Sequence, residues 1–326
     1  MKQIVAGSFL AAGLILPAAD AQTPLVDAFA PYLGSCWSAP LGDLPVPEIQ
    51  CFEALENDFV RRTHSVAGPH GMHYGEEVMH WDSETNRIVT RYYNDSRGVV
   101  DSDGAIVEGA PVLFSYNDWD GGLQLRMHWG AVTGDEAVFQ REQYFGPDFG
   151  GWNTEEPRIF TRTGPASGFD AGSGNQYPRG DTVEAFGPLL NACWSAPFEG
   201  SERLDIHCFS SVFGIHVRDR HISPGAPDYT GETIFHTDAE TSELRFRYFN
   251  SIGGVSNGTG TPGDGEIVFS EETYIAGDGT TRRFRGRYSN ISIDGYESVT
   301  EELENGEWIT VSRQHFTRAE NPFAPD

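Results

Sequence analysis

The chain has 326 residues, of which 38% are hydrophobic, and its 48 acidic against 22 basic residues give a formal net charge of −26. This length and hydrophobic content suffice for two domains of ordinary size. Nucleic acid and anionic lipid surfaces carry the same sign as the chain and repel it. The composition therefore excludes nucleic acid as an expected partner, while the acidity by itself identifies no substrate.

Residues 1–21 have the pattern of a secretory signal. Lys2 precedes an apolar run over residues 4–18, and Ala-Asp-Ala at 19–21 is a small-x-small cleavage pattern. We expect cleavage before Gln22 and a periplasmic or secreted protein. The alternative is a membrane anchor, but the run is shorter than the ~18–20 apolar residues that span a bilayer. No later stretch approaches that length, so no integral membrane segment is expected after cleavage.

One stretch of the sequence occurs twice, as VDAFAPYLGSCW at 26–37 and as VEAFGPLLNACW at 183–194. The matches continue downstream at an offset of 157 and then 156 residues, which predicts a tandem duplication. The Gly-, Ser- and Pro-rich segment between the copies is predicted to be a linker; its alternative is a long loop of one fused domain. The expected divisions are a signal (1–21), a first domain (22–163), a linker (164–182), a second domain (183–318) and a tail (319–326).

Four cysteines in an exported protein favour disulfides over free thiols. Three pairings are possible, and we expect Cys36–Cys51 with Cys193–Cys208, because each copy then closes the same short loop. A cysteine zinc site is not expected, since the CxxC spacing is missing and two cysteines in each domain leave two ligands each. We predict no metal and no cofactor.

The first copy is predicted to consist of short strands at 35–40, 48–55, 58–66, 74–82, 87–94, 112–117, 123–130, 136–145 and 157–163. These segments are rich in Val, Ile, Thr, Tyr and Phe, and Gly, Asp, Asn and Pro separate them. Only residues 26–33 look helical. The Asp-rich stretches at 101–104 and 118–121 lack the remaining ligands of a calcium loop and are predicted to be turns. Many short antiparallel strands indicate a sandwich or a barrel.

A leader helix, a Trp on the first strand and an Arg on the last strand resemble the calycin superfamily, which includes the lipocalins and fatty-acid-binding proteins. The residues that carry the resemblance are Gly34 and Trp37 with Arg162, and Trp194 with Arg318. The resemblance implies about eight strands in each copy, a Trp that closes one end of the barrel and an Arg that lies across its face. The expected fold is all-β, with two tandem antiparallel lipocalin-like β-barrels, each with a short N-terminal leader helix.

Four polar residues recur at matching positions of the two copies, as the pairs His64 and His221, Glu76 and Glu232, His80 and His236, and Tyr92 and Tyr248. Glu76 and His80 are four apart on a predicted strand, about 13 Å, which is too far for them to bind one metal ion. A hairpin turn near residue 70 would place His64 opposite Glu76. We therefore predict an interior His–Glu pair beside a Tyr in each barrel, as a candidate ligand-binding site. The alternative is a satisfied polar pair that fixes the strand register.

No nucleophile motif, zinc-protease motif or phosphate-binding glycine loop is present, so we name no catalytic residue. The leading hypothesis is a non-catalytic protein that binds a small, partly apolar ligand in one or both barrels. One alternative is an isomerase or hydrolase that uses the His–Glu–Tyr cluster. Another is a structural or interaction protein of the cell envelope with no open cavity. The expected partner is a small molecule, and the sequence does not give the oligomeric state.

Overall fold

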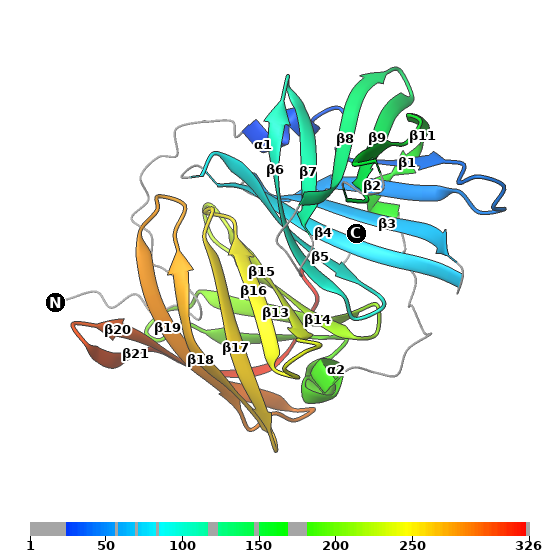
Figure 1. Cartoon of the computed structure of the whole chain (residues 1–326). Helices are drawn as coiled ribbons and strands as arrows, with labels where there is room; N and C mark the ends of the chain where they lie inside the picture. Colours follow the sequence, from blue (N-terminus) through cyan, green and yellow to red (C-terminus); the bar gives the residue numbers. More distant parts are fainter. Residues whose placement is uncertain are drawn as a thin grey trace. The chain divides into compact units, whose positions relative to one another are not determined.

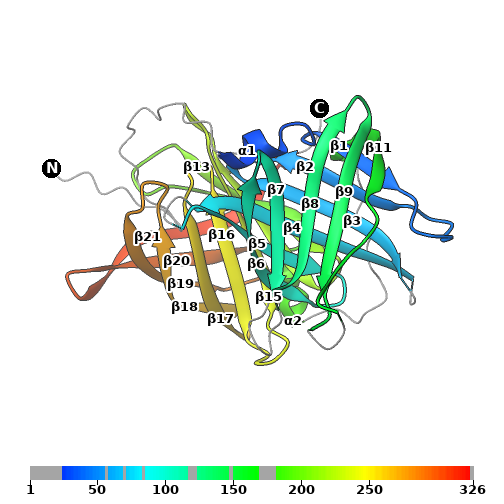
Figure 2. The same cartoon turned by 45° about the horizontal axis from the view of Figure 1, so that its top comes forward.

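A computed structural model of the chain describes residues 24–55, 58–68, 71–82, 85–116, 123–146, 150–168 and 181–323. In this part the chain forms two closed, antiparallel, ten-stranded β-barrels in tandem. Figures 1 and 2 show the strands of both barrels, coloured along the sequence. The predicted all-β fold with two barrels is confirmed. The predicted signal with its cleavage site, most of the predicted linker and the last three residues of the tail lie outside the described residues.

Barrel 1 begins with the short helix α1 (Pro24–Phe29). Its ring contains ten strands: β1 (Ser35–Ala39), β2 (Glu48–Ala54), β3 (Val60–Gly68), β4 (Gly71–Asp82), β5 (Arg87–Asn94), β6 (Val99–Val107), β7 (Ala110–Tyr116), β8 (Leu123–Thr133), β9 (Glu136–Tyr144) and β11 (Arg158–Pro165). Neighbours in the chain pair up to β9, and β11 then joins β9 to β1. The short strand β10 (Trp152–Thr154) extends the edge of β9 beside β11. β11 and the 3-10 turn η3 (Ala166–Gly168) reach into the segment that was predicted to be a linker.

Barrel 2 begins with α2 (Asp181–Ala185) and η4 (Gly187–Leu189). Its ring contains β12 (Ala192–Pro197), β13 (Leu204–Val212), β14 (His216–Ser223), β15 (Tyr229–Thr237), β16 (Leu244–Asn250), β17 (Val255–Gly263), β18 (Glu266–Ile275), β19 (Thr281–Ser289), β20 (Gly295–Glu304) and β21 (Glu307–Ala319). Each strand pairs with the next, and β21 pairs with β12 to close the ring. Among the helices that the structure describes, none is long and apolar enough to cross a membrane.

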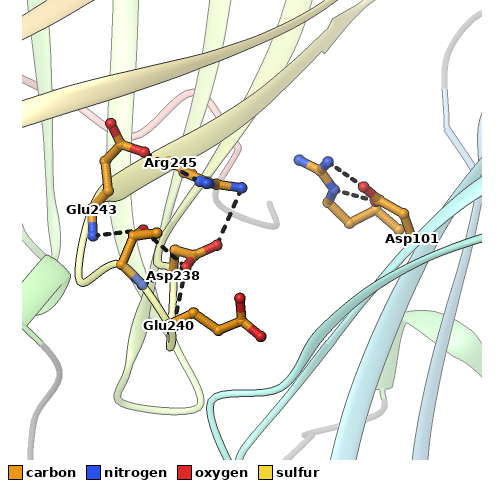
Figure 3. A network of polar contacts seen from close by, with 7 residues as sticks. Asp101, Asp238, Glu240, Glu243 and Arg245 are labelled. Carbon is orange, nitrogen blue, oxygen red and sulfur yellow. Dashed lines mark hydrogen bonds and ion pairs between the residues drawn. The ribbon is translucent and has the colours of Figure 1, made fainter. Parts of the chain in front are cut away.

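The ten strands in each ring correct the expectation of about eight. The strand that the sequence missed in barrel 1 is β6, which contains the stretch at 101–104 that was predicted to be a turn. Arg91 on β5 donates to Asp101 over 2.5 and 2.7 Å (Figure 3), and Arg87 pairs with Asp103. Such cross-strand ion pairs support a strand whose own residues are poor strand formers. The second stretch, 118–121, lies outside the described residues.

The turn between β15 and β16 shows a different use of an aspartate. Asp238 accepts hydrogen bonds from the backbone N–H groups of Glu240 and Thr241, over 3.1 and 2.9 Å, and lies 3.2 Å from Arg245 (Figure 3). The hydrogen bonds from Thr241 and Glu240, together with the charge of Arg245, lower the pKa of Asp238. This Asx-type turn fixes the hairpin that carries the interior face of β15 and β16.

Both predicted disulfides are present. Cys36 on β1 is joined to Cys51 directly opposite on β2, and Cys193 on β12 is joined to Cys208 on β13. Each bond closes a hairpin of 15 residues at the same register position. Each barrel therefore has its own disulfide at the same position, next to the seam where the ring closes.

The framework Trp and Arg residues meet at that seam. Trp37 is registered with Arg162, whose guanidinium carbon lies 4.5 Å from the ring centroid. In barrel 2 the matching distance between Arg318 and Trp194 is 5.0 Å. Both are cation–π contacts across the strands that close the barrel.

The interior of each barrel has an apolar half next to its leader helix and a polar half beyond it. In barrel 1 the apolar half packs under α1 and contains Leu25, Phe29, Tyr32, Trp37, Ala39, Phe52, Val60, Met79, Ile88, Leu113, Trp129, Ala137, Phe139 and Phe160. Because side chains alternate along a strand, the residues two positions further on β2 to β5 face the same interior. These residues are mostly polar, and they form the candidate site of barrel 1.

Candidate functional site

A glycine lies directly across from the central histidine in both barrels. His64 on β3 pairs with Gly75 on β4, and His221 on β14 pairs with Gly231 on β15. A Cβ atom on Gly75 would overlap both the Nε2 atom of His64 and the hydroxyl of Tyr92. The missing side chain is therefore what allows the two rings to meet.

Three rings and one carboxylate form a continuous hydrogen-bonded chain in barrel 1. The Tyr92 hydroxyl lies 2.9 Å from Nε2 of His64 and 3.2 Å from Nε2 of His73, while Nδ1 of His73 lies 2.6 Å from Oδ1 of Asp95. A carboxylate accepts, so Nδ1 of His73 donates to Asp95, and in the neutral tautomer that carries this proton Nε2 of His73 accepts from the Tyr92 hydroxyl. The Tyr92 oxygen is left to accept from His64. In this arrangement Tyr92 both donates and accepts a hydrogen bond.

The chain of groups reaches the rim of the barrel. The His73 side chain is 33% exposed, whereas that of Asp95 is 5% exposed. His64 and Tyr92 are partly buried, and their rings stack with a centroid distance of 5.6 Å and an interplanar angle of 21°. The partly exposed His73 ring is therefore the point at which this chain of groups meets solvent.

The electrostatics keep the two inner groups neutral at pH 7. Burial and the positive charge of Arg62 hold the pKa of His64 well below its usual value. Burial raises the pKa of Tyr92, and the nearby Glu77 and Asp95 add to this although Arg62 opposes them. Both groups therefore act as hydrogen-bond donors and acceptors and not as charges.

A buried ion pair underlies the site. Arg62 Nη2 lies 2.9 Å from Glu77 Oε2, and the Arg62 guanidinium carbon lies 5.2 Å from the centroid of the Trp129 ring. Thr90 donates to Glu77 over 2.5 Å, and Trp129 Nε1 donates to Gln50 over 3.2 Å. These side chains fill the barrel below the His–Tyr pair, which leaves the accessible part of the site at the rim.

The predicted His–Glu pair is wrong by one residue of register. Glu76 is opposite Thr63, while His64 is opposite Gly75. A one-residue shift moves a side chain to the other face of the sheet. Glu76 consequently lies outside the barrel interior, with its Oε1 3.3 Å from Nε of Arg61.

The same correction applies to three other predicted site residues, which lie on the outer faces of their strands. Their contacts are Glu232 with Arg218 at 2.9 Å, His80 with the Phe59 ring at 5.5 Å between centroids, and His236 with the His216 ring at 6.4 Å. Of the eight predicted residues, the structure brings together only the His–Tyr pair in each barrel. The prediction that these residues form one interior cluster is therefore wrong for the two glutamates and for the outer histidines.

In barrel 2 the His–Tyr pair is retained, but its surroundings differ. The Tyr248 hydroxyl lies 3.3 Å from His221 Nε2, and it also forms a short hydrogen bond with Tyr229. Tyr229 replaces His73, and Ser251 replaces Asp95, so the Asp–His part of the chain is replaced here. Burial raises the pKa of Tyr248 well above its usual value, as it does for Tyr92.

Barrel 2 instead carries a buried cluster of two acids and two histidines. His207 Nδ1 lies 2.7 Å from Asp219 Oδ2, and His207 Nε2 lies 3.3 Å from Asp205 Oδ2. The ring of His221 lies 4.9 Å from that of His207 in an edge-on arrangement. All four residues are at most 3% exposed. The matching positions in barrel 1 are Glu48, Gln50, Arg62 and His64.

The surroundings in this cluster shift the pKa values of both histidines, in opposite directions. Burial would lower the pKa of His207, but the Asp219 and Asp205 carboxylates outweigh burial and raise it to about 10. Burial and the neighbouring His207 lower the pKa of His221 to about 3. A positive charge is therefore favoured between the two carboxylates and disfavoured at the adjacent ring.

Sequence reasoning missed Asp205, His207 and Asp219, although two of them lie in a repeated stretch. That stretch reads EIQCF in the first copy and DIHCF in the second. The substitution of Gln50 by His207, on a strand with alternating polar residues, was the available signal. The contribution of Asp219 could not be read in this way, because the residue lies on the next strand and replaces an arginine.

Two cavities of the described part of the chain lie away from the duplicated residues. A cavity of about 10 Å³ in barrel 1 touches Trp37 and Trp129, and this is room for at most one water molecule. A cavity of about 580 Å³ lies at barrel 2 between residues 197–202 and 313–315. The apolar half of barrel 1 is filled by its own side chains around the small cavity.

No family model matches the chain, and no curated protein matches it. Among solved structures, the chain is similar to the crystal structure of a protein of unknown function from the DUF3598 family of Nostoc punctiforme PCC 73102. The two share 15% sequence identity over 90% of this chain and 99% of that chain, with a TM-score of 0.23. The function of this neighbour is unknown, so the assignment of a site rests on the geometry of the present chain.

Proposed function

We propose that the protein is an exported binding protein that holds a small, partly apolar ligand at the rim of barrel 1. The observation that carries this proposal is the hydrogen-bonded chain from Asp95 through His73 and Tyr92 to His64. It presents a partly exposed imidazole beside a stacked His–Tyr surface. A ligand with one hydrogen-bonding group and a flat apolar body matches this surface.

Binding fits the electrostatics better than acid–base catalysis does. A general acid or base is most effective when its pKa lies near the working pH. The pKa of His64 lies well below that range, and the pKa of Tyr92 is raised away from it. Both groups are suited to orienting a ligand with fixed hydrogen bonds.

The compartment and the wider family are part of the same proposal. Disulfides persist in oxidising compartments, which supports export together with the signal pattern at residues 1–21. A leader helix and a Trp–Arg contact at the barrel seam support a calycin-like origin of both domains. Barrels of that kind commonly hold one small ligand.

One observation favours an enzyme as the second candidate. Asp95, His73 and Tyr92 are ordered as carboxylate, imidazole and hydroxyl, which is the order of groups in a nucleophile triad. In this reading Tyr92 and not a serine would be the reacting hydroxyl. Glu76 takes no part, because its register places it on the other face.

Native mass spectrometry of protein purified from its own cells tests the proposal. We expect a retained small molecule on the wild type and at least tenfold less of it on Tyr92→Phe, which removes only the central hydroxyl. Tyr248→Phe is the matched control in barrel 2 and should retain the molecule. A wild-type protein with no bound molecule, or equal retention by Tyr92→Phe, would overturn the proposal. Turnover of the retained molecule would replace it with the enzyme.

A further inference from the structure

We propose that barrel 2 binds one divalent transition-metal ion of the zinc type through Asp205, His207 and His221. This site lies in the other barrel from the proposed ligand site. Zinc binding in barrel 2 is therefore tested independently of ligand binding in barrel 1.

Strand geometry brings the three side chains together. Asp205 and His207 are two apart on β13 and so share a face, and His207 is registered directly with His221 on β14. One ligand atom from each residue lies within 4.8 Å of the other two. Ligands about 2.1 Å from a tetrahedral ion are about 3.4 Å apart, so the three groups need to close by roughly 1 Å around it.

The hydrogen bonding of His207 orients it as a metal ligand. Its Nδ1 atom donates to Asp219, which leaves Nε2 facing Asp205. That Nε2 atom is buried, and it lies 3.3 Å from Oδ2 of Asp205, another of the proposed ligands. A carboxylate that holds one nitrogen of a histidine while the other binds the ion is the usual outer support of zinc sites.

A comparison of the two barrels shows how the buried charges at these positions differ. Barrel 1 has its own permanent cation, Arg62, which is paired with Glu77. At the matching positions barrel 2 has Asp219 and Thr233. The second copy has therefore lost the Arg62–Glu77 ion pair and has gained the buried carboxylate of Asp219 and a histidine in place of Gln50. A bound divalent cation would compensate this exchange.

The donor set selects the kind of ion. Two imidazoles and one carboxylate suit Zn²⁺ and its neighbours in the first transition row. Ca²⁺ and Mg²⁺ prefer oxygen ligands throughout and do not match it. Three protein ligands leave a fourth coordination position for water or a ligand atom.

The burial of the cluster determines how the test is designed. The three ligand residues are at most 3% exposed, so an ion enters slowly into the folded barrel. Full-length protein is therefore treated with a chelator, unfolded in urea and refolded with ZnCl₂. Bound zinc is then counted by elemental analysis after gel filtration, with CaCl₂ as the parallel probe.

We expect about one zinc and no calcium per wild-type chain. His207→Gln, which introduces the side chain found at Gln50, and Asp205→Asn should reduce zinc to background. The matched control His64→Gln lies in barrel 1 and should keep one zinc. Circular dichroism checks that each variant has refolded. A wild type without zinc, or a folded His207→Gln variant that keeps one zinc, would overturn the proposal.

Asp219 provides an independent measure because it positions His207 without contacting the ion. Asp219→Asn should retain one zinc per chain but bind it about 10–100-fold more weakly. An unchanged zinc affinity in this variant would contradict the proposed orientation of His207. This readout holds even if Asp205→Asn fails to fold.

Discussion

The ring of His64 stacks on the ring of Tyr92 at 5.6 Å because the residue facing them on β4 is Gly75. A methyl group at that position must displace both rings. We expect Gly75→Ala to lower the free energy of unfolding of barrel 1 by about 1–3 kcal/mol, which is the usual cost of overpacking a filled site. Urea unfolding followed by tryptophan fluorescence measures it, since five of the seven tryptophans are in the first copy.

The control for this substitution is Gly164→Ala. Gly164 also lies in a strand of barrel 1, opposite Cys36, but a Cβ there meets no atom within 4 Å. Its unfolding midpoint should stay close to that of the wild type. Equal effects of the two alanines would show that chain entropy and not the His–Tyr contact determines the result.

Substitutions of the buried Arg62–Glu77 pair should have non-additive effects on the free energy of unfolding. Arg62→Met leaves the Glu77 carboxylate buried without its cation, which typically costs about 3–5 kcal/mol. The double variant Arg62→Met, Glu77→Leu removes both charges and should recover most of that loss. A double variant as unstable as the single one would mean that packing against Trp129, and not charge, is what Arg62 contributes.

Glu272 predicts how the stability of barrel 2 depends on pH. Burial raises its pKa from 4.5 to about 8, although a hydrogen bond from Ser256 partly opposes this. The folded state then holds a proton that the unfolded state releases between these values. The contribution of Glu272 is therefore complete below pH 4.5 and is lost as the pH rises to about 8, by at most about 1.4 kcal/mol per unit.

Replacing Glu272 by Gln should flatten the stability profile between pH 5 and 8, as urea midpoints at several pH values will show. Glu271→Gln is the matched control, because Glu271 is the exposed neighbour on β18 and pairs with Arg283. This control should keep the slope of the wild type. An unchanged slope in Glu272→Gln would assign the pH dependence to other groups.

Each disulfide closes a loop of 15 residues and should contribute about 3 kcal/mol to its own barrel. Replacing Cys36 and Cys51 by Ala should lower the midpoint of barrel 1, and replacing Cys193 and Cys208 should lower that of barrel 2. Urea unfolding with and without a reductant measures both. The four-alanine variant should not respond to reductant, and a wild type that does not respond either would contradict this assignment of stability.

The architecture could largely be predicted from sequence, because repetition and alternation are local signals. The two copies, their disulfides and the seam residues Trp37 and Arg162 follow from the repeat and from a family resemblance. Strand β6 was missed because its aspartates are poor strand formers, and only their arginine partners on β5 explain them. Such partners become visible once the strands are paired.

The site depended on register, which a sequence fixes poorly. Pairing of Gly68 with Gly71 centres the β3–β4 hairpin half a residue before position 70. That half residue moves the partner of His64 from Glu76 to Gly75, so the Glu76 side chain lies on the opposite face of the sheet from His64. The cluster of barrel 2 was harder to predict, because His207 and His221 come from different strands and become neighbours only through the register of β13 with β14.

Closure of each ring also has a consequence for folding. The seams at Trp37–Arg162 and Trp194–Arg318 join the first and last strands of a repeat, so a ring is complete only after its whole repeat has been made. Both seams have the same Trp–Arg match, which makes the last strand of one copy a competitor for the first strand of the other. Strand exchange between copies is a characteristic misfolding of duplicated chains, and the matching seams make it the misfolded form expected of this one.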